Sequence, residues 1–120
     1  MIANHLAYGQ EAEQQALDFL QSKGLRLQER NFCCKTGEID LIMRDAQTLV
    51  FVEVRFRQSN DYGRALETVT AGKQRKLLNT ANRYLQMKHI DSACRFDVIA
   101  LNGSGSTPIE WIKNAIQIAW

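Results

Sequence analysis

The sequence predicts an α/β fold, a mixed β-sheet with helices packed on it, in the order α-β-β-β-α-β plus a short terminal element. Two segments repeat apolar residues at helical spacing, and four are rich in β-branched and aromatic residues. The second helical segment separates two strands, which permits a crossover between parallel neighbours. A length of 120 residues suits one domain, residues 1–120.

The first helix is expected over residues 5–23 and is followed by Gly24, a typical C-terminal stop. Its apolar residues recur at helical spacing, so one face should be buried. That face is formed by Ala12, Ala16, Leu17 and Leu20, with Phe19 at its margin.

The second helix is expected over residues 71–88, with Thr70 as its N-cap. A hydroxyl at this position accepts a hydrogen bond from an otherwise unpaired backbone N–H of the first turn. The predicted buried stripe consists of Leu77, Leu78, Ala81 and Leu85.

Four strands are expected from runs of Ile, Leu, Val and Phe. They cover residues 25–33, 38–44, 48–57 and 95–101. Residues 58–66 are polar and are predicted to form a loop, and residues 102–108 a connector. The segment 109–120 leaves two elements open: IEWI is compatible with a short strand, and KNAIQIAW with a closing helix.

Composition excludes several classes without identifying a partner. A formal net charge of +2 is too small to indicate nucleic-acid binding, so the placement of the charges must decide. No segment is typical of a secretory signal or of a membrane span. Cys33, Cys34 and Cys94 suit neither a disulfide framework nor a zinc site with chelating spacing. We therefore expect a cytoplasmic protein with free thiols.

The second and third strands are predicted to form a hairpin closed around Ala46-Gln47. This register places Leu41 opposite Val52, Met43 opposite Val50, and Asp40 opposite Glu53. Strand alternation then separates two faces. The apolar face is predicted to carry Ile39, Leu41, Met43, Val50, Val52, Val54 and Phe56. The other face is predicted to carry Glu38, Asp40, Ile42, Phe51, Glu53, Arg55 and Arg57.

Two carboxylates directly opposite each other destabilise a hairpin, so Asp40 and Glu53 require an explanation. They share a proton with one pKa raised, or they pair with Arg55 or Arg57, or they bind a divalent cation such as Mg²⁺. Glu13 lies near the buried face of the first helix. It is either a third acid of the same site or an edge residue that reaches solvent.

The second helix adds positive charge through Lys73, Lys76 and Arg83. A basic helix beside an acidic metal site suits a phosphodiester substrate, although a solvated helix face explains the same residues. Glu38 and Gln74 are expected to be accessory residues, because each lies close to the predicted site.

The chain also resembles a known family, the YraN-like bacterial proteins of undefined function. The resemblance rests on GEIDLI (37–42) and VFVEVR (50–55) at this spacing. ERNF (29–32), ANRYL (81–85) and RFDVIAL (95–101) extend it over nearly the whole chain. That family is similar to the archaeal Holliday junction resolvases. The resemblance implies a restriction-endonuclease-like fold.

The resemblance also implies roles for individual residues. Asp40 and Glu53 match the nuclease carboxylates, Glu13 matches the acid of the first helix, and Arg55 stands where a lysine is expected. Together with the Val54 carbonyl, the acids would hold Mg²⁺ or Mn²⁺. Arg57, Lys73, Lys76 and Arg83 would contact the DNA backbone.

The expected function is metal-dependent cleavage of branched or structured DNA, with Asp40, Glu53 and Arg55 as catalytic residues, in a protein that forms at most a homodimer. An arginine cannot act as a general base, so the alternative is a catalytically inactive nucleic-acid-binding or adaptor module that retains the fold.

Overall fold

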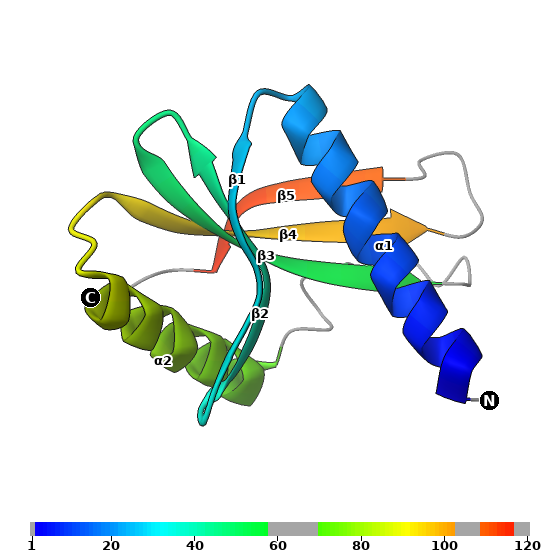
Figure 1. Cartoon of the computed structure of the whole chain (residues 1–120), viewed down its shortest axis with the longest axis horizontal. Helices are drawn as coiled ribbons and strands as arrows, with labels where there is room; N and C mark the ends of the chain where they lie inside the picture. The colour runs from blue at the N-terminus through cyan, green and yellow to red at the C-terminus, as the bar shows by residue number, and fades with distance from the viewer. Residues whose placement is uncertain (1, 58–69, 103–108, 117–120) are drawn as a thin grey trace.

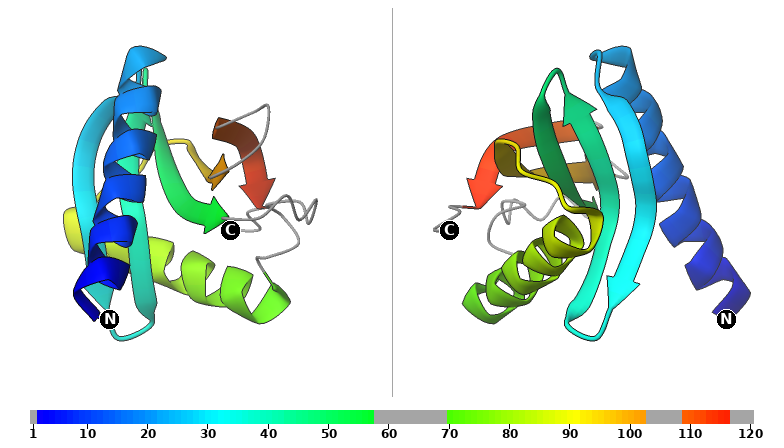
Figure 2. Two further views of the ribbon diagram at one scale, coloured as in Figure 1. Left: turned by 90° about the vertical axis from the view of Figure 1, so that its right-hand side faces the viewer. Right: turned by 60° about the vertical axis from the view of Figure 1, so that its left-hand side comes forward.

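The computed structural model describes residues 2–57, 70–102 and 109–116, with the side chains of residues 10–56 in the first range. Within these ranges, helices α1 (Ile2–Ser22) and α2 (Ala71–Lys88) lie on opposite faces of a five-stranded mixed sheet (Figures 1 and 2). Its strands are β1 (Arg26–Cys34), β2 (Gly37–Asp45), β3 (Thr48–Arg57), β4 (Cys94–Asn102) and β5 (Ile109–Ile116). The predicted α/β class and mixed sheet are confirmed.

The strands lie in sequence order across the sheet, β1-β2-β3-β4-β5. The first three form an antiparallel meander, α2 carries the chain to β4 parallel to β3, and β5 runs antiparallel to β4. The predicted loop at 58–66 lies outside the described residues, as do residues 103–108 of the connector. Neither described helix is both long and apolar enough to cross a membrane.

The segment that the sequence left ambiguous is a strand throughout its described part. β5 extends to Ile116, so the closing-helix interpretation is wrong for residues 113–116. The register shifts between Phe96 and Val98, and Asn114 has a φ of 52°, which absorbs the irregularity. Ile116 then lies opposite Phe96 and is buried. Residues 117–120 lie outside the described ranges.

The two faces of the sheet, each covered by one helix (Figure 2), bury separate apolar cores. The core under α1 includes Ala12, Ala16, Leu17, Leu20, Leu41, Met43, Val50 and Val52, so the predicted buried face of this helix is confirmed. The core under α2 includes Ile39, Ile42, Phe51, Leu77, Ala81, Tyr84 and Phe96.

The buried stripe of α2 differs from the predicted one. Leu77 and Ala81 are buried, but Leu78 and Leu85 are only partly buried, and Thr80 and Tyr84 take the central positions. The Tyr84 hydroxyl remains hydrogen-bonded because it accepts from Gln28 Nε2 at 3.0 Å. A buried tyrosine with a partner for its hydroxyl packs as well as a leucine, which apolar spacing alone does not reveal.

The ends of the helices follow their predicted signals. The Thr70 hydroxyl accepts a hydrogen bond from the Lys73 backbone N–H at 3.2 Å, which confirms the N-cap. After α1, Gly24 adopts a φ of 96°, which allows the Leu25 N–H to donate to the Leu20 carbonyl at 3.1 Å.

The predicted hairpin register is confirmed at the pairs Leu41–Val52 and Met43–Val50. The predicted face is wrong for Ile39, which packs under α2 rather than beside Leu41. Phe56 is 43% exposed, so it is not part of the buried core. Along β2, the side chains directly before and after Asp40 pack on opposite faces of the sheet, whereas strict alternation predicts the same face. Asp40 is also the residue on which the functional prediction depends.

Candidate active site

Asp40 lies where the β2–β3 pairing ends. The described register runs from Asp45–Thr48 to Leu41–Val52. Beyond it, the Asp40 side chain takes the place of a backbone partner: its Oδ2 accepts a hydrogen bond from the Val54 N–H at 2.8 Å. The N–H and C=O of a strand residue point to the same neighbouring strand, so the Val54 carbonyl is directed to this side as well.

Glu53 lies one residue before Val54 and is 8% exposed. It shares the strand face of Phe51, which packs under α2. Burial raises the pKa of Glu53, whereas the positive charges of Arg55 and Lys73 act in the opposite direction. Its Oε1 is 3.8 Å from Arg55 Nε, so the two form an ion pair.

The two carboxyl groups lie close enough to interact strongly. Burial and the charge of Glu53 raise the pKa of Asp40 to about 7. Of the three explanations predicted for this pair, an arginine partner is observed for Glu53 in Arg55, and the raised pKa of Asp40 is in the direction that a shared proton requires.

The Arg55 guanidinium has donors that are buried but not hydrogen-bonded to any described residue. Its Nε and Nη2 atoms have no hydrogen-bond partner within the described part of the chain. The side chain is 22% exposed. Buried guanidinium donors without an acceptor are costly, and an anion beside the carboxylate pair would satisfy them.

Glu13 belongs to α1 and does not reach solvent freely, because its side chain is only 16% exposed. Arg30 Nη2 lies 3.7 Å from Glu13 Oε1, and Asn31 donates a further hydrogen bond. Burial raises the pKa of Glu13, and the charge of Asp40 raises it further. Glu13 thus acts on Asp40 through space while it is paired with Arg30.

Glu38 is exposed at the start of β2, opposite Cys33 in β1. The Cys33 thiol donates to Glu38 Oε2 at 3.3 Å. The three cysteines are free thiols, as predicted.

The donor atoms around Asp40 suit a hard divalent cation, since carboxylates and a carbonyl are the ligands that Mg²⁺ and Mn²⁺ prefer. Among the residues that the structure describes, no three Asp, Glu, His or Cys side chains form a metal-binding group. Mg²⁺ is commonly bound through one or two carboxylates plus substrate phosphate and water. The pair formed by Asp40 and Glu53 fits that mode, with Val54 as an additional backbone ligand.

The predicted DNA-contacting residues occupy different positions. Lys73 is half-buried in the first turn of α2, where its charge reaches Glu53. Lys76 and Arg83 are exposed on the same helix. Gln74 is half-buried and makes an interaction of its own. The β3 strand ends at Arg57, whose side chain lies outside the described part.

Sequence reasoning missed two sets of polar residues. Asp97 in β4 is fully buried and accepts from Arg95, Trp111 and the Asn114 backbone. Its position inside the apolar run RFDVIAL was the available signal, since a lone acid there requires partners. Arg30 and Asn31, which hold Glu13, carried no comparable signal.

The comparisons with known proteins agree with the predicted resemblance. The family model described as "Uncharacterised protein family UPF0102" matches residues 12–101. A UPF0102 protein of Psychromonas ingrahamii is 49% identical over 106 residues, which cover 88% of this chain and 86% of the relative. For Shewanella loihica the identity is 47% over 113 residues, covering 94% and 96%. For Nitrosomonas europaea it is 50% over 109 residues, covering 91% and 92%. The YraN-like resemblance is confirmed.

Proposed function

The chain belongs to the uncharacterised protein family UPF0102, and we propose that it is a metal-dependent endonuclease of restriction-endonuclease-like fold. Its proposed reaction is hydrolysis of phosphodiester bonds in branched or otherwise structured DNA. The observation that carries the proposal is the pair formed by the half-buried Asp40 and the buried Glu53, in which burial and the charge of Glu53 raise the pKa of Asp40 to about 7. A divalent cation would relieve the repulsion between the two carboxylates and would take the place of the proton on Asp40.

Each residue of the site has a defined task in this reaction. Asp40 and Glu53 hold the cation through carboxylate oxygens, and Val54 contributes its carbonyl. A bound Mg²⁺ or Mn²⁺ would supply a water of lowered pKa and charge stabilisation at the scissile phosphate. Asp40 must lose its proton before it binds the cation, so binding strengthens as the pH rises through about 7.

Arg55 supplies the electrostatic part of the mechanism. Its unpartnered Nε and Nη2 donors would bind the non-bridging oxygens of the phosphate, where negative charge develops in the transition state. Because a guanidinium does not release a proton at useful pH, Arg55 orients and stabilises the phosphate but does not act as a base. Glu13, held by Arg30, adds negative charge near Asp40.

Substrate binding is assigned to α2 and the end of β3. The α2 sequence contains five Lys or Arg residues and no acidic residue. Lys73, Lys76 and Arg83 would contact the phosphate backbone together with Arg57, which gives affinity without base readout. Two cuts in a branched substrate require two sites, so we propose a homodimer as the active form.

The second candidate function is a nucleic-acid-binding or adaptor module without catalysis. Arg55 favours it, because the site then has no side chain positioned as a general base other than its own carboxylates. Such a module would bind branched DNA with a steep salt dependence and would leave it uncut in the presence of Mg²⁺ or Mn²⁺.

Cleavage of a labelled four-way DNA junction with Mg²⁺ or Mn²⁺ separates these functions. We expect Asp40→Asn and Glu53→Gln to reduce cleavage by about a hundredfold or more, because each removes a charged metal ligand. Asp18→Asn, at an exposed acid of α1 remote in sequence from the pair, serves as the matched control. An uncut junction that is bound tightly by the wild type would favour the adaptor, and a gain of cleavage in Arg55→Lys would identify a degenerate nuclease.

Metal binding is tested separately by the thermal stability of the protein. We expect Mn²⁺ at about ten times its dissociation constant to stabilise the wild type by about 1.4 kcal/mol at pH 8. The same addition should have little effect at pH 5, where Asp40 keeps its proton, or in Asp40→Asn. Equal Mn²⁺ stabilisation of the wild type and Asp40→Asn would place the metal elsewhere.

A further inference from the structure

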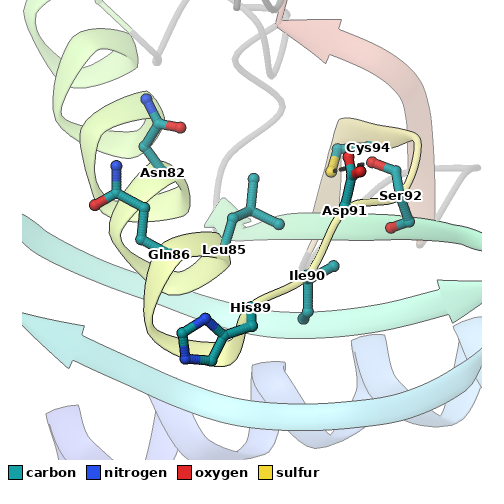
Figure 3. Close-up of a pocket in the computed structure, with 8 residues that line it drawn as sticks. All are labelled: Asn82, Leu85, Gln86, His89, Ile90, Asp91, Ser92 and Cys94. Atoms are coloured by element: carbon teal, nitrogen blue, oxygen red, sulfur yellow. Dashed lines mark hydrogen bonds between the residues drawn. The ribbon is translucent and has the colours of Figure 1, made fainter.

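A hollow lies at the C-terminal end of α2, away from the carboxylate pair. It has a volume of about 650 Å³ and is formed by the last two turns of α2 and the segment that leads into β4 (Figure 3). This volume lies within the range of about 300–1,000 Å³ that is typical of small-molecule sites. None of the proposed catalytic residues lines it.

The floor of the hollow is apolar. Leu85, Ile90 and Cys94 pack partly buried against the core under α2, so their remaining surface faces the hollow. Burial raises the pKa of the Cys94 thiol, whose Sγ donates to the Ser92 carbonyl at 3.3 Å. The Cys94 side chain therefore contributes a neutral surface.

The rim carries two amides and an imidazole. Asn82 and Gln86 lie one helical turn apart, and Figure 3 shows both amide groups on the same side of α2. His89 follows the helix with φ 54° and ψ 46°, a left-handed conformation that is most often taken by glycine at this position. Its backbone N–H donates to the Gln86 carbonyl at 3.4 Å, which closes the C-terminal end of α2.

The charges of the hollow decide which ligand it suits. No Lys or Arg lines it, whereas the carboxylate of Asp91 does. The Asp91 carboxylate would repel a phosphate placed in the hollow, but it would not repel a neutral aromatic heterocycle. Carboxamides of Asn and Gln pair with the edge of adenine, and His side chains stack on unpaired bases.

We propose that this hollow binds an unpaired nucleobase, with adenine preferred, of the same DNA that reaches the carboxylate pair. The inference rests on the proposed function for its substrate, but the binding itself does not require cleavage. Lys73 and Gln86 are separated by about 20 Å along α2, because each helical residue adds about 1.5 Å. Since duplex DNA rises by about 3.4 Å per step, the unpaired base would lie about six steps from the cut.

The first test is an NMR titration of the full chain with adenosine 5′-monophosphate in the absence of metal. We expect saturable shifts of the Asn82 and Gln86 side-chain amides and of His89, with a dissociation constant on the order of 1 mM. Gln86→Leu should weaken binding by about fivefold or more, because it removes a paired amide. Asn79→Leu is the control, since Asn79 is exposed on the same helix but does not line the hollow.

Two outcomes would overturn the proposal. One is equal binding to Gln86→Leu and Asn79→Leu. The other is an identical shift pattern with ribose 5-phosphate, which would identify an anion site. Asp40→Asn should bind adenosine 5′-monophosphate like the wild type. Loss of junction cleavage would therefore leave this inference intact, and loss of nucleotide binding with intact cleavage would remove only the inference.

The second test uses a branched DNA with one unpaired adenine about six steps from the branch, compared with the same DNA carrying an abasic residue there. We expect the wild type to bind the adenine form about tenfold more tightly, which is the usual effect of one stacked base. Gln86→Leu should reduce that preference. An equal affinity of the wild type for both forms would contradict the proposal.

Discussion

Two acids in the same sheet, the fully buried Asp97 and the half-buried Asp40, differ in how their charges are compensated. Asp97 is fully buried and is surrounded by donors. Arg95 Nε lies 3.1 Å from Oδ1 and 3.2 Å from Oδ2, Trp111 Nε1 donates at 3.0 Å, and the Asn114 N–H donates at 2.9 Å. The hydrogen bonds to water that this carboxylate lost on burial are replaced by hydrogen bonds from these donors. The carboxylate therefore has a structural role.

Asp40 has a different environment. One described donor, the Val54 N–H, reaches its Oδ2, and its nearest charged neighbour is another carboxylate, Glu53. The nearby cation, Arg55, pairs with Glu53, and two of its buried nitrogens have no hydrogen-bond partner among the residues that the structure describes. The comparison teaches that burial alone does not mark a functional acid. An acid whose charge is incompletely compensated is a better candidate, because its site gains free energy when it binds a proton or a cation.

The largest predicted effect tests the structural role of Asp97. We expect Asp97→Asn to lower the free energy of unfolding by about 3 kcal/mol, because it removes the fully buried carboxylate that accepts from Arg95, Trp111 and the Asn114 N–H. Chemical denaturation at pH 7 measures this loss. Asp45→Asn removes the other acid that contacts Arg95, but Asp45 is 38% exposed, so we expect a loss of less than about 1 kcal/mol. Equal losses in both variants would contradict the distinction.

The next effect has the opposite sign and concerns Asp40. The folded protein raises the pKa of this group from 3.8 to about 7, so the folded state binds the proton more tightly than the unfolded chain does. Wild-type stability should therefore fall as the pH rises from about 4 to about 7 and then level off. Asp40→Asn does not titrate at this position and should be more stable than the wild type by about 1 kcal/mol at pH 8.

The stability of the two proteins against urea, measured from pH 4 to pH 8 without divalent cations, provides the check. The difference between them should grow over this range. If the stabilities of the wild type and Asp40→Asn changed in parallel with pH, the charge of Asp40 would be compensated as fully as that of Asp97.

The smallest predicted effects concern single interactions around Asp97. Trp111→Phe removes the Nε1 donor but keeps a ring beside Phe19, whose centroid lies 5.9 Å from that of Trp111. We expect a loss of about 1 kcal/mol by thermal denaturation, because Arg95 and Asn114 still hold the carboxylate. Lys113→Met, which removes only the ammonium 4.4 Å from the Trp111 ring, should cost about 0.5 kcal/mol. The comparison would be weakened by a loss in Trp111→Phe as large as that in Asp97→Asn.

Local chemistry explains which predictions from the sequence were confirmed. The Thr70 cap determines where α2 begins, and the length of the turn at Ala46-Gln47 determines which residues of β2 and β3 lie opposite each other. These signals act between residues close in the chain. The turn length alone therefore suffices to bring Asp40 and Glu53 close together in the hairpin.

The errors in the prediction have a common physical cause. Ile39 was assigned to the wrong face because the Asp40 side chain takes up the Val54 N–H and strict alternation ends there. Tyr84 was missed because its hydroxyl finds Gln28, which is distant in sequence. The strand at 109–116 forms because β4 offers an edge that pairs with it. Each outcome depends on a partner that the local sequence does not specify.

The sequence by itself determined the order of the elements up to β4, the hairpin register from Asp45–Thr48 to Leu41–Val52 and the identity of the two neighbouring acids, because these follow from periodicity, capping and turn length. Only the tertiary structure decided how each acid is compensated. Asp97 accepts from Arg95, two residues before it in β4, and from Trp111 and Asn114 of β5, whereas Asp40 lies at the point where two strands separate. The sequence sets the charge of each acid, but the β5 donors reach Asp97 only because β5 pairs with β4.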